Sequence, residues 1–210
     1  MTHSYFLGAA INKKAAELAI KVAQEGGALT LGGICQCPTY LDDAGKEAVQ
    51  HEFRKQVQVF DDNGLDFVLC EYFEHIEEME WAIQVCKEFD MPVAATMCIG
   101  PMGDLHGVPA GECAVRMAKA GANLVGVNCH FDPFVTLEAI KLMKEGLEGA
   151  QLLDQVYLMC QPIAFFTPDA ERQGFIDLPE FPFALEPRVA TRWDIHRFAR
   201  EAYELGTKIV

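Results

Sequence analysis

The segment ANLVGVNC, residues 122–129, decides the fold. It is a nearly continuous apolar run, which is typical of a parallel strand buried on both faces rather than of a strand with one wet face. A helical pattern, TLEAIKLMKEGLEGA at residues 136–150, follows it closely. The two together predict a strand with its crossover helix, which is the repeating unit of α/β folds.

The same unit recurs along the whole chain. Strands are expected at residues 28–34, 65–73, 91–100, 122–129, 156–165 and 207–210, and helices at residues 11–27, 44–61, 76–89, 111–121, 136–150 and 191–206. The last of these helices has Thr191 as its expected N-cap and Gly206 at its end. Six strands with helical crossovers fit either an open doubly wound sheet or a (β/α)8 barrel.

The glycine pattern and the two ends of the sequence favour the barrel. No G-x-G-x-x-G motif follows the first apolar run, so a dinucleotide-binding sheet has no support. The sequence opens on a helix and stops inside an expected strand. We therefore predict an α/β fold, an incomplete (β/α)8 TIM-type barrel with about six of its eight strands, as one domain over residues 1–210 that is truncated at both ends.

Composition and charge narrow the classes of partner. The 210 residues are 50% hydrophobic and 23% charged, as in globular domains, and the formal net charge is −14. Nucleic acids and anionic membranes require basic patches, so neither is an expected partner. No apolar run reaches the roughly 20 residues that span a bilayer. The eight cysteines, several inside apolar runs, together with the absence of a secretion signal, predict a reduced cytoplasmic protein.

The uncommon side chains gather where the expected strands end. These ends read GGICQCPTY, CEYFEH, MCIGPMGDLHG, NCHFDP and CQPIAFFTPD. Functional groups of parallel α/β folds lie at the carboxyl ends of the strands. We therefore expect the site at this edge of the sheet.

Cys129 closes one of these strands and has three possible roles: metal ligand, nucleophile or buried thiol. A single cysteine is more often structural, but its position at a strand end favours function. The adjacent His130 could activate a thiol. Neighbouring residues of an extended segment point to opposite faces, so we expect His130 to pack beside the site rather than to form a dyad with Cys129.

Glu71 and Tyr72 lie at the end of another expected strand. A carboxylate there can bind a substrate ammonium through a charge-assisted hydrogen bond. The alternative is an acid that stabilises the first turn of the next helix, which suits Glu74, Glu77 and Glu78 better than Glu71. The C-x-C pair at residues 35–37 has no partner at zinc-finger spacing, and structural thiols are favoured there.

Five segments carry a resemblance to a known family. They are EYFEH at 71–75, PVAATMCIGPMGDLHGVPAGECAVR at 92–116, GVNCHFDP at 126–133, KLMKEGLEGA at 141–150 and QGFIDLPEFPFALEPRVATRWDI at 173–195. Across nearly its whole length the chain resembles the betaine–homocysteine S-methyltransferases, which belong to the homocysteine-binding zinc methyltransferases. The last segment is the most specific to this group.

The resemblance implies a zinc-dependent transfer of a methyl group from betaine to homocysteine, giving methionine and dimethylglycine. A zinc-bound thiol loses its proton readily and becomes a strong nucleophile at neutral pH. The family's first zinc cysteine matches Cys129, its homocysteine-binding glutamate matches Glu71, and the neighbouring tyrosine matches Tyr72. The parent enzymes are expected to be homo-oligomers.

The resemblance also implies parts that this sequence lacks. The family's other two zinc ligands are adjacent cysteines in a GGCCG motif, expected just where the sequence stops at Val210. The zinc site is therefore expected to be incomplete. Two alternatives stay open: a catalytically inactive fragment or interaction protein, and a homocysteine methyltransferase that uses S-methylmethionine.

Overall fold

The chain forms a parallel sheet of five strands, as the repeated strand–helix units predict. The computed structural model describes the backbone of residues 2–210 and the side chains of residues 8–210. The strands are β1 (Leu31–Ile34), β2 (Phe67–Phe73), β3 (Val93–Met97), β4 (Leu124–Cys129) and β5 (Tyr157–Pro162). They pair in chain order, every pair parallel. Strand order equal to chain order is the arrangement of a barrel wall rather than of a doubly wound sheet.

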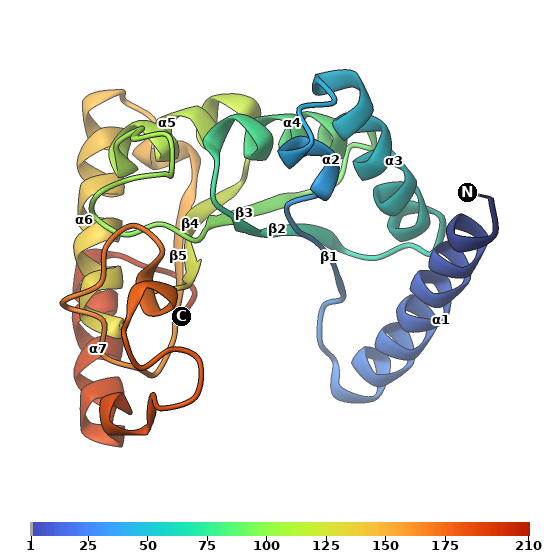
Figure 1. Cartoon of the computed structure of the whole chain (residues 1–210). Helices are drawn as coiled ribbons and strands as arrows, with labels where there is room; N and C mark the ends of the chain where they lie inside the picture. The colour runs from blue at the N-terminus through green and yellow to red at the C-terminus, as the bar shows by residue number, and fades with distance from the viewer. Residues whose placement is uncertain (1) are drawn as a thin grey trace.

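Seven α-helices connect and cover these strands. They are α1 (Thr2–Gly26), α2 (Pro38–Leu41), α3 (Lys46–Asp62), α4 (Ile76–Glu88), α5 (Ala110–Ala120), α6 (Pro133–Gly149) and α7 (Arg192–Leu205) within the described residues. Figure 1 shows α3 to α6 on one side of the sheet, with α1 and α7 at its two ends. None of the helices within residues 2–210 is both long and apolar enough to cross a bilayer.

The helices end where the sequence chemistry predicts. Thr191 caps α7 in a capping box with Asp194: the Thr191 hydroxyl accepts from the Asp194 N–H, and the Asp194 carboxylate accepts from the Thr191 N–H. Gly121 and Gly206 follow α5 and α7 in the left-handed conformation that favours glycine. The four-residue helix α2, which Pro38 starts, was not expected from the sequence.

The two faces of the sheet differ in how they are covered. Alternate residues such as Val125, Val127 and Cys160 face the helices and belong to one large buried core. On the opposite, concave face the buried apolar side chains form a small separate cluster of Leu69, Ala94 and Met159. The concave face corresponds to the interior of a barrel whose wall is incomplete here.

The sixth expected strand, residues 207–210, is reduced to a single parallel bridge. Ile209 pairs with Met159, through hydrogen bonds from the Cys160 N–H to the Ile209 carbonyl (3.0 Å) and from the Lys208 N–H to the Leu158 carbonyl (2.9 Å). Both are backbone hydrogen bonds of the kind that pair neighbouring strands, as expected for a strand beside β5. The four residues make only two such bonds with β5. The sheet described by residues 2–210 therefore has five strands and one bridge, rather than six strands.

Helices α5 and α6 touch backbone to backbone at two glycines. A Cβ on Gly146 would lie 2.6 Å from the Gly111 carbonyl oxygen, and one on Gly111 would lie 2.8 Å from the Leu142 carbonyl oxygen. No side chain larger than hydrogen fits between the two helices at this crossing.

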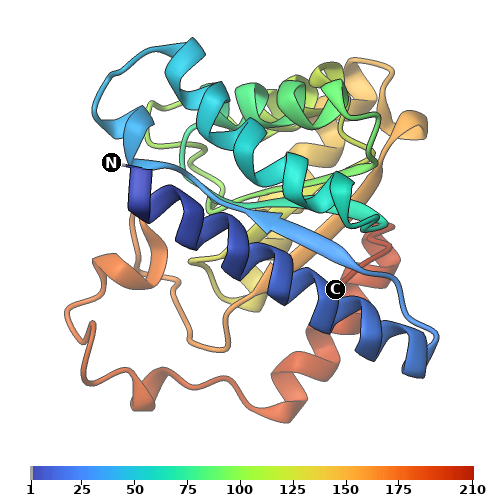
Figure 2. The same cartoon turned by 90° about the vertical axis from the view of Figure 1, so that its right-hand side faces the viewer.

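A long segment between β5 and α7, residues 163–191 and called the strap below, has no strand and only short 3-10 turns at Gly174–Asp177 and Glu186–Arg188. Figures 1 and 2 show the strap, drawn in orange, on the side of the sheet opposite α3, α4 and α5. Arg188 holds it together through ion pairs with Asp169 (2.6 Å) and Glu180 (3.0 Å). The strap is therefore an ordered part of the fold.

Candidate functional site

The three residues predicted to form the site lie at the carboxyl ends of neighbouring strands. Glu71 and Tyr72 are in the last part of β2, and Cys129 is the last residue of β4. Both strands pair with β3, so a single strand separates them. This is the edge at which (β/α)8 barrels carry their functional groups.

The backbone is unusual at two of these residues. Tyr72 has φ = 62° and Cys129 has φ = 55°, the left-handed region that side chains other than glycine rarely adopt. The register between β2 and β3 also shifts between Cys70 and Phe73. Strand alternation therefore stops at these residues, and the local turn directs their side chains. Such conformations cost roughly 1–3 kcal/mol each and are often found at functional sites.

Asn128 links the two strand ends through its side-chain amide. The amide oxygen accepts from the Tyr72 N–H at 3.4 Å and lies 3.7 Å from the Cys98 sulfur, while the amide nitrogen donates to Cys129 Sγ at 3.2 Å. Turned over, the same amide still accepts from the Tyr72 N–H (3.3 Å) and donates instead to the Thr96 carbonyl (3.2 Å). A thiolate at Cys129 favours the first orientation, because an anionic sulfur needs a donor.

The thiol of Cys129 is acidified by its surroundings. Hydrogen bonding with the Cys98 thiol lowers the pKa of Cys129 to about 7, with a smaller contribution from Asn128, against the opposing effects of burial and the negative charge of Glu71. The same hydrogen bond, followed by burial, raises the pKa of Cys98. Cys98 therefore keeps its proton, and Cys129 is the sulfur of the pair that is ready to bind an electrophile or a metal.

The Glu71 carboxylate has no protein partner. Among residues 8–210 no hydrogen bond or ion pair to it is found. Its Oε1 lies over Gly33 of β1, where an added Cβ would be 3.4 Å away. Because Glu71 does not cap the following helix, the role of first-turn acid does not apply to it. It is a carboxylate free to bind a cation.

His130 is a packing residue, as the sequence predicted, and not the partner of Cys129. It is 1% exposed, and neither ring nitrogen has a hydrogen-bond partner within residues 8–210. Its ring lies edge-on to the Tyr72 ring, with centroids 5.1 Å apart. Burial lowers the pKa of His130, so the imidazole is neutral.

Two residues of the site escaped the sequence analysis, Cys98 and Asn128. Cys98 lies within an apolar run and has the pattern of a buried hydrophobic residue, and Asn128 has no sequence signal that marks it as a link between two strands. The loop containing Asp104 is fixed to the start of α4: the Asp104 carboxylate accepts from the N–H groups of Ile76, the first residue of that helix (3.1 Å), and of Val108 (2.8 Å).

The described residues do not by themselves make a zinc site. Within residues 8–210 no group of three or more His, Cys, Asp or Glu side chains is placed to hold a metal ion. Protein zinc sites generally use three or four protein ligands. Cys129 provides one suitable thiolate ligand. The other ligands that a zinc ion requires are not found around it among the described residues.

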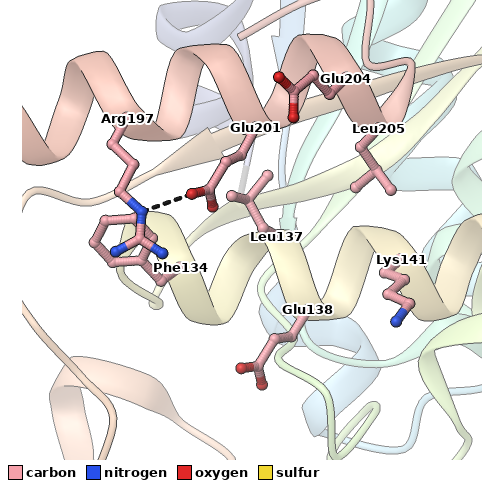
Figure 3. Close-up of a pocket in the computed structure, with 8 residues that line it drawn as sticks. All are labelled: Phe134, Leu137, Glu138, Lys141, Arg197, Glu201, Glu204 and Leu205. Carbon is pink, nitrogen blue, oxygen red and sulfur yellow. Dashed lines mark hydrogen bonds and ion pairs between the residues drawn. The ribbon is translucent and has the colours of Figure 1, made fainter.

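A separate cavity of about 470 Å³ lies between α6 and α7 (Figure 3). Its floor contains Phe134, Leu137 and Leu205, and Arg197 lies over the Phe134 ring at 4.6 Å while pairing with Glu201 at 2.6 Å. None of the three predicted site residues lines it. Because it lies between two outer helices rather than at the strand ends, we do not assign the site to it.

Comparison with known proteins identifies the family. The model of the family described as "Homocysteine S-methyltransferase" matches residues 3–210. The chain belongs to the homocysteine S-methyltransferase family. It is 59% identical over 203 residues to "Betaine--homocysteine S-methyltransferase 1" of Mus musculus, covering 97% of this chain and 49% of that protein. The chain thus spans about half the length of this relative.

A second similar protein is named for a different methyl donor. "S-methylmethionine--homocysteine S-methyltransferase BHMT2" of Rattus norvegicus is 54% identical over 201 residues, covering 96% of this chain and 55% of that protein. Among solved structures, the homocysteine methyltransferase MmuM from Escherichia coli in its oxidized form superposes with a TM-score of 0.69. It is 15% identical and covers 98% of this chain and 66% of that one. This likeness supports the fold.

Proposed function

We propose that this chain forms the homocysteine-binding part of an enzyme that transfers a methyl group from betaine to homocysteine, giving methionine and dimethylglycine. The observation that carries the proposal is the gathering of Glu71, Tyr72 and Cys129 at the carboxyl ends of β2 and β4. Family membership supports the reaction class, and the 59% identity to the mouse betaine-dependent relative supports the donor.

Glu71 and Tyr72 are proposed to bind homocysteine. An unpaired carboxylate at the mouth suits the ammonium group of an amino acid, because a charge-assisted hydrogen bond is about twice as strong as a neutral one. Tyr72 follows it directly, and its half-buried ring provides a wall of the site. The negative charge of Glu71 acts on Cys129, since it opposes the lowering of that pKa. The amino-group site and the sulfur site are thus neighbours.

Cys129 is proposed as one thiolate ligand of a zinc ion. Its lowered pKa supports this role, because the thiolate rather than the thiol binds metals. Since the described donor set is too small for zinc, the remaining ligands must come from residues other than those described here. The resemblance to the family points to a pair of adjacent cysteines.

Two alternative functions have specific support. The 54% identity to the rat relative favours S-methylmethionine as donor, and comparing methyl transfer from betaine and from S-methylmethionine discriminates the two. The small donor set favours a catalytically inactive homocysteine-binding or interaction protein. The free state of all eight cysteines within the described residues supports our further proposal of a cytoplasmic location, and homo-oligomers are proposed by analogy with the family.

Calorimetric titration of homocysteine into the 210-residue chain tests the binding site. Glu71→Gln should weaken binding about 10- to 100-fold, because a hydrogen bond to a charged group contributes about 1.5–3 kcal/mol. Glu77→Gln, a change of the same kind at an exposed residue of α4, is the matched control and should bind as the unmodified chain does. Equal affinities for the unmodified chain and Glu71→Gln would contradict the proposal.

Zinc bound per chain tests the metal role separately. In the complete enzyme of which this chain is proposed to form a part, Cys129→Ser should lower the zinc content, measured by atomic emission after dialysis, because it removes a thiolate ligand. Cys35→Ser changes an exposed thiol near the end of β1 and is the control. Zinc that stays equally bound in Cys129→Ser would show that the metal does not use this residue.

A further inference from the structure

The strap is attached to the segment that follows Cys129 at two points. The Asp132 carboxylate accepts from the Thr167 N–H at 2.7 Å, and the Thr167 hydroxyl accepts from the Asp132 N–H at 2.9 Å. Further along the strap, the Phe175 N–H donates to the His130 carbonyl at 2.8 Å. Buried and charge-assisted bonds of this kind fix geometry well. The middle of the strap therefore has a defined position relative to His130.

Gly174 makes the second attachment possible. Its φ is +62°, and a Cβ added to it would lie 2.0 Å from the His130 carbonyl oxygen. Both the conformation and the close approach require glycine. The strap backbone therefore lies directly against the His130 backbone, and a side chain at residue 174 would separate them.

A row of aromatic rings runs from the strap to the site. Phe181 lies edge-on to Phe175 (centroids 5.4 Å apart), Phe175 to His130 (5.6 Å), and His130 to Tyr72 (5.1 Å). Edge-to-face pairs at these distances are favourable and directional. The neutral, fully buried His130 ring has no hydrogen bonds within residues 8–210 that would hold it otherwise, so its orientation depends on the rings on either side.

The Tyr72 ring has few other constraints. The Tyr72 hydroxyl has no hydrogen bond among residues 8–210, and His130 is the one aromatic neighbour found for its ring there. The Tyr72 backbone is held in the left-handed region, where rotamer preferences from regular strands do not apply. Its ring direction is therefore set largely by His130.

We propose that Phe175, acting through His130, is a positioning residue that holds the Tyr72 ring in the orientation in which it binds homocysteine. The inference rests on the proposed function in assigning Tyr72 to the homocysteine site. In this proposal the strap helps to position a residue of the homocysteine site and does not merely cover it. The contact between Gly174 and His130 is where the strap fixes the position of His130. Phe175 itself does not touch the substrate.

A ring-removing substitution in the strap tests this inference. Phe175→Leu keeps apolar volume but removes the ring edge, so it should fold where Phe175→Ala fails. Loss of one or two ring contacts should weaken homocysteine binding about five- to tenfold by titration calorimetry. Phe183→Leu is the matched control, because Phe183 lies in the same strap and is 91% exposed. It should bind homocysteine as the unmodified chain does.

Two readouts separate positioning from general support. In chain labelled with 3-fluorotyrosine, the Tyr72 resonance, assigned by its loss in Tyr72→Phe, should shift in Phe175→Leu and stay in Phe183→Leu. In a Tyr72→Ala background, Phe175→Leu should have no further effect on homocysteine affinity, because the residue through which it acts is gone. The inference is wrong if the Tyr72 resonance does not shift in Phe175→Leu. It is also wrong if Phe175→Leu weakens homocysteine binding as much in the Tyr72→Ala background as in the unmodified chain. If Tyr72→Ala alone leaves the affinity unchanged, the proposed function fails, and the fluorine shift still decides whether Phe175 holds the ring.

Discussion

The helix-covered face of the sheet and its concave face bury apolar side chains on very different scales. On the helix side, residues of all five strands join one continuous core with α1 and α3 to α7, and many of its members are fully buried. On the concave side, three buried residues and two partly buried neighbours form the whole cluster found in the described part of the chain. At the edges of that face, Leu31 is 42% and Tyr157 59% exposed.

The contrast indicates that stability and the candidate site depend on different parts of the molecule. The free energy of burial scales with the apolar area removed from water, so most of it comes from the helix side. The residues proposed to bind substrate stand at the rim, where strand alternation ends and the backbone of Tyr72 and Cys129 is strained. The fold thus provides a stable layer that can support unfavourable conformations at the strand ends.

Substitution of two methionines, one on each face of the sheet, should give the largest change in the free energy of unfolding. Met79 on α4 is 0% exposed in the large core, and Met159 on β5 is 6% exposed in the concave cluster. Met79→Ala should lower the free energy of unfolding by about 4 kcal/mol and Met159→Ala by about 2 kcal/mol, because the concave cluster leaves room for water and for relaxation. Urea denaturation followed by circular dichroism measures both. Equal losses would show that the two faces contribute alike.

A buried acid in the helix layer should give the next largest change in stability, and this change depends on pH. Glu78 is fully buried, its Oε1 accepts from the Cys37 N–H at 2.7 Å, and burial raises its pKa from 4.5 to about 7. Because the folded state holds this proton more tightly, the contribution of Glu78 to stability is complete below pH 4.5 and is lost as the pH rises through 7. Glu78→Gln keeps the oxygen acceptor and should be more stable than the unmodified chain at pH 8, by about 2–3 kcal/mol.

Thermal or urea unfolding between pH 5 and pH 8 checks this prediction. The exposed neighbour Glu77 is the control, because Glu77→Gln should keep the pH dependence of the unmodified chain. A pH profile that is unchanged in Glu78→Gln would mean that Glu78 is ionised at no cost in the folded chain.

A substitution on the outer surface of the helix layer should give the smallest change in the free energy of unfolding. Arg197 in the groove between α6 and α7 contacts the Phe134 ring and Glu201 (Figure 3). Its side chain is largely exposed, so Arg197→Ala should cost about 0.5 kcal/mol in unfolding free energy. The same urea experiment serves as the baseline for the methionine pair. A loss as large as that of Met159→Ala would make this surface as important as the concave cluster.

The order of strands and helices could be predicted from the sequence because burial on both faces leaves a continuous apolar signature. Five of the expected strands are present, and the caps at Thr191 and Gly206 occur where their chemistry requires. Residues 207–210 show the limit of the pattern: they read as a strand, but strand formation depends on how many ladder bonds the neighbours can supply.

The position of the candidate site residues in the fold could be predicted from the sequence, but their local geometry could not. Strand ends are visible in sequence, and Glu71, Tyr72 and Cys129 lie at the carboxyl ends of β2 and β4, where the sequence predicts them. The left-handed turns at Tyr72 and Cys129 were not predictable, because no glycine marks them. The effect of Cys98 on Cys129 depends on a contact across two strands, and residues 31 positions apart carry no local signal of such a contact.

The glycine contact between α5 and α6 has a consequence for motion. Because the backbones of Gly111 and Gly146 meet with no side chain between them, opening of either helix breaks the contact that also protects the other. We expect their slowest-exchanging amides to become accessible to deuterium together, as a single cooperative block that also carries the end of β4 between them.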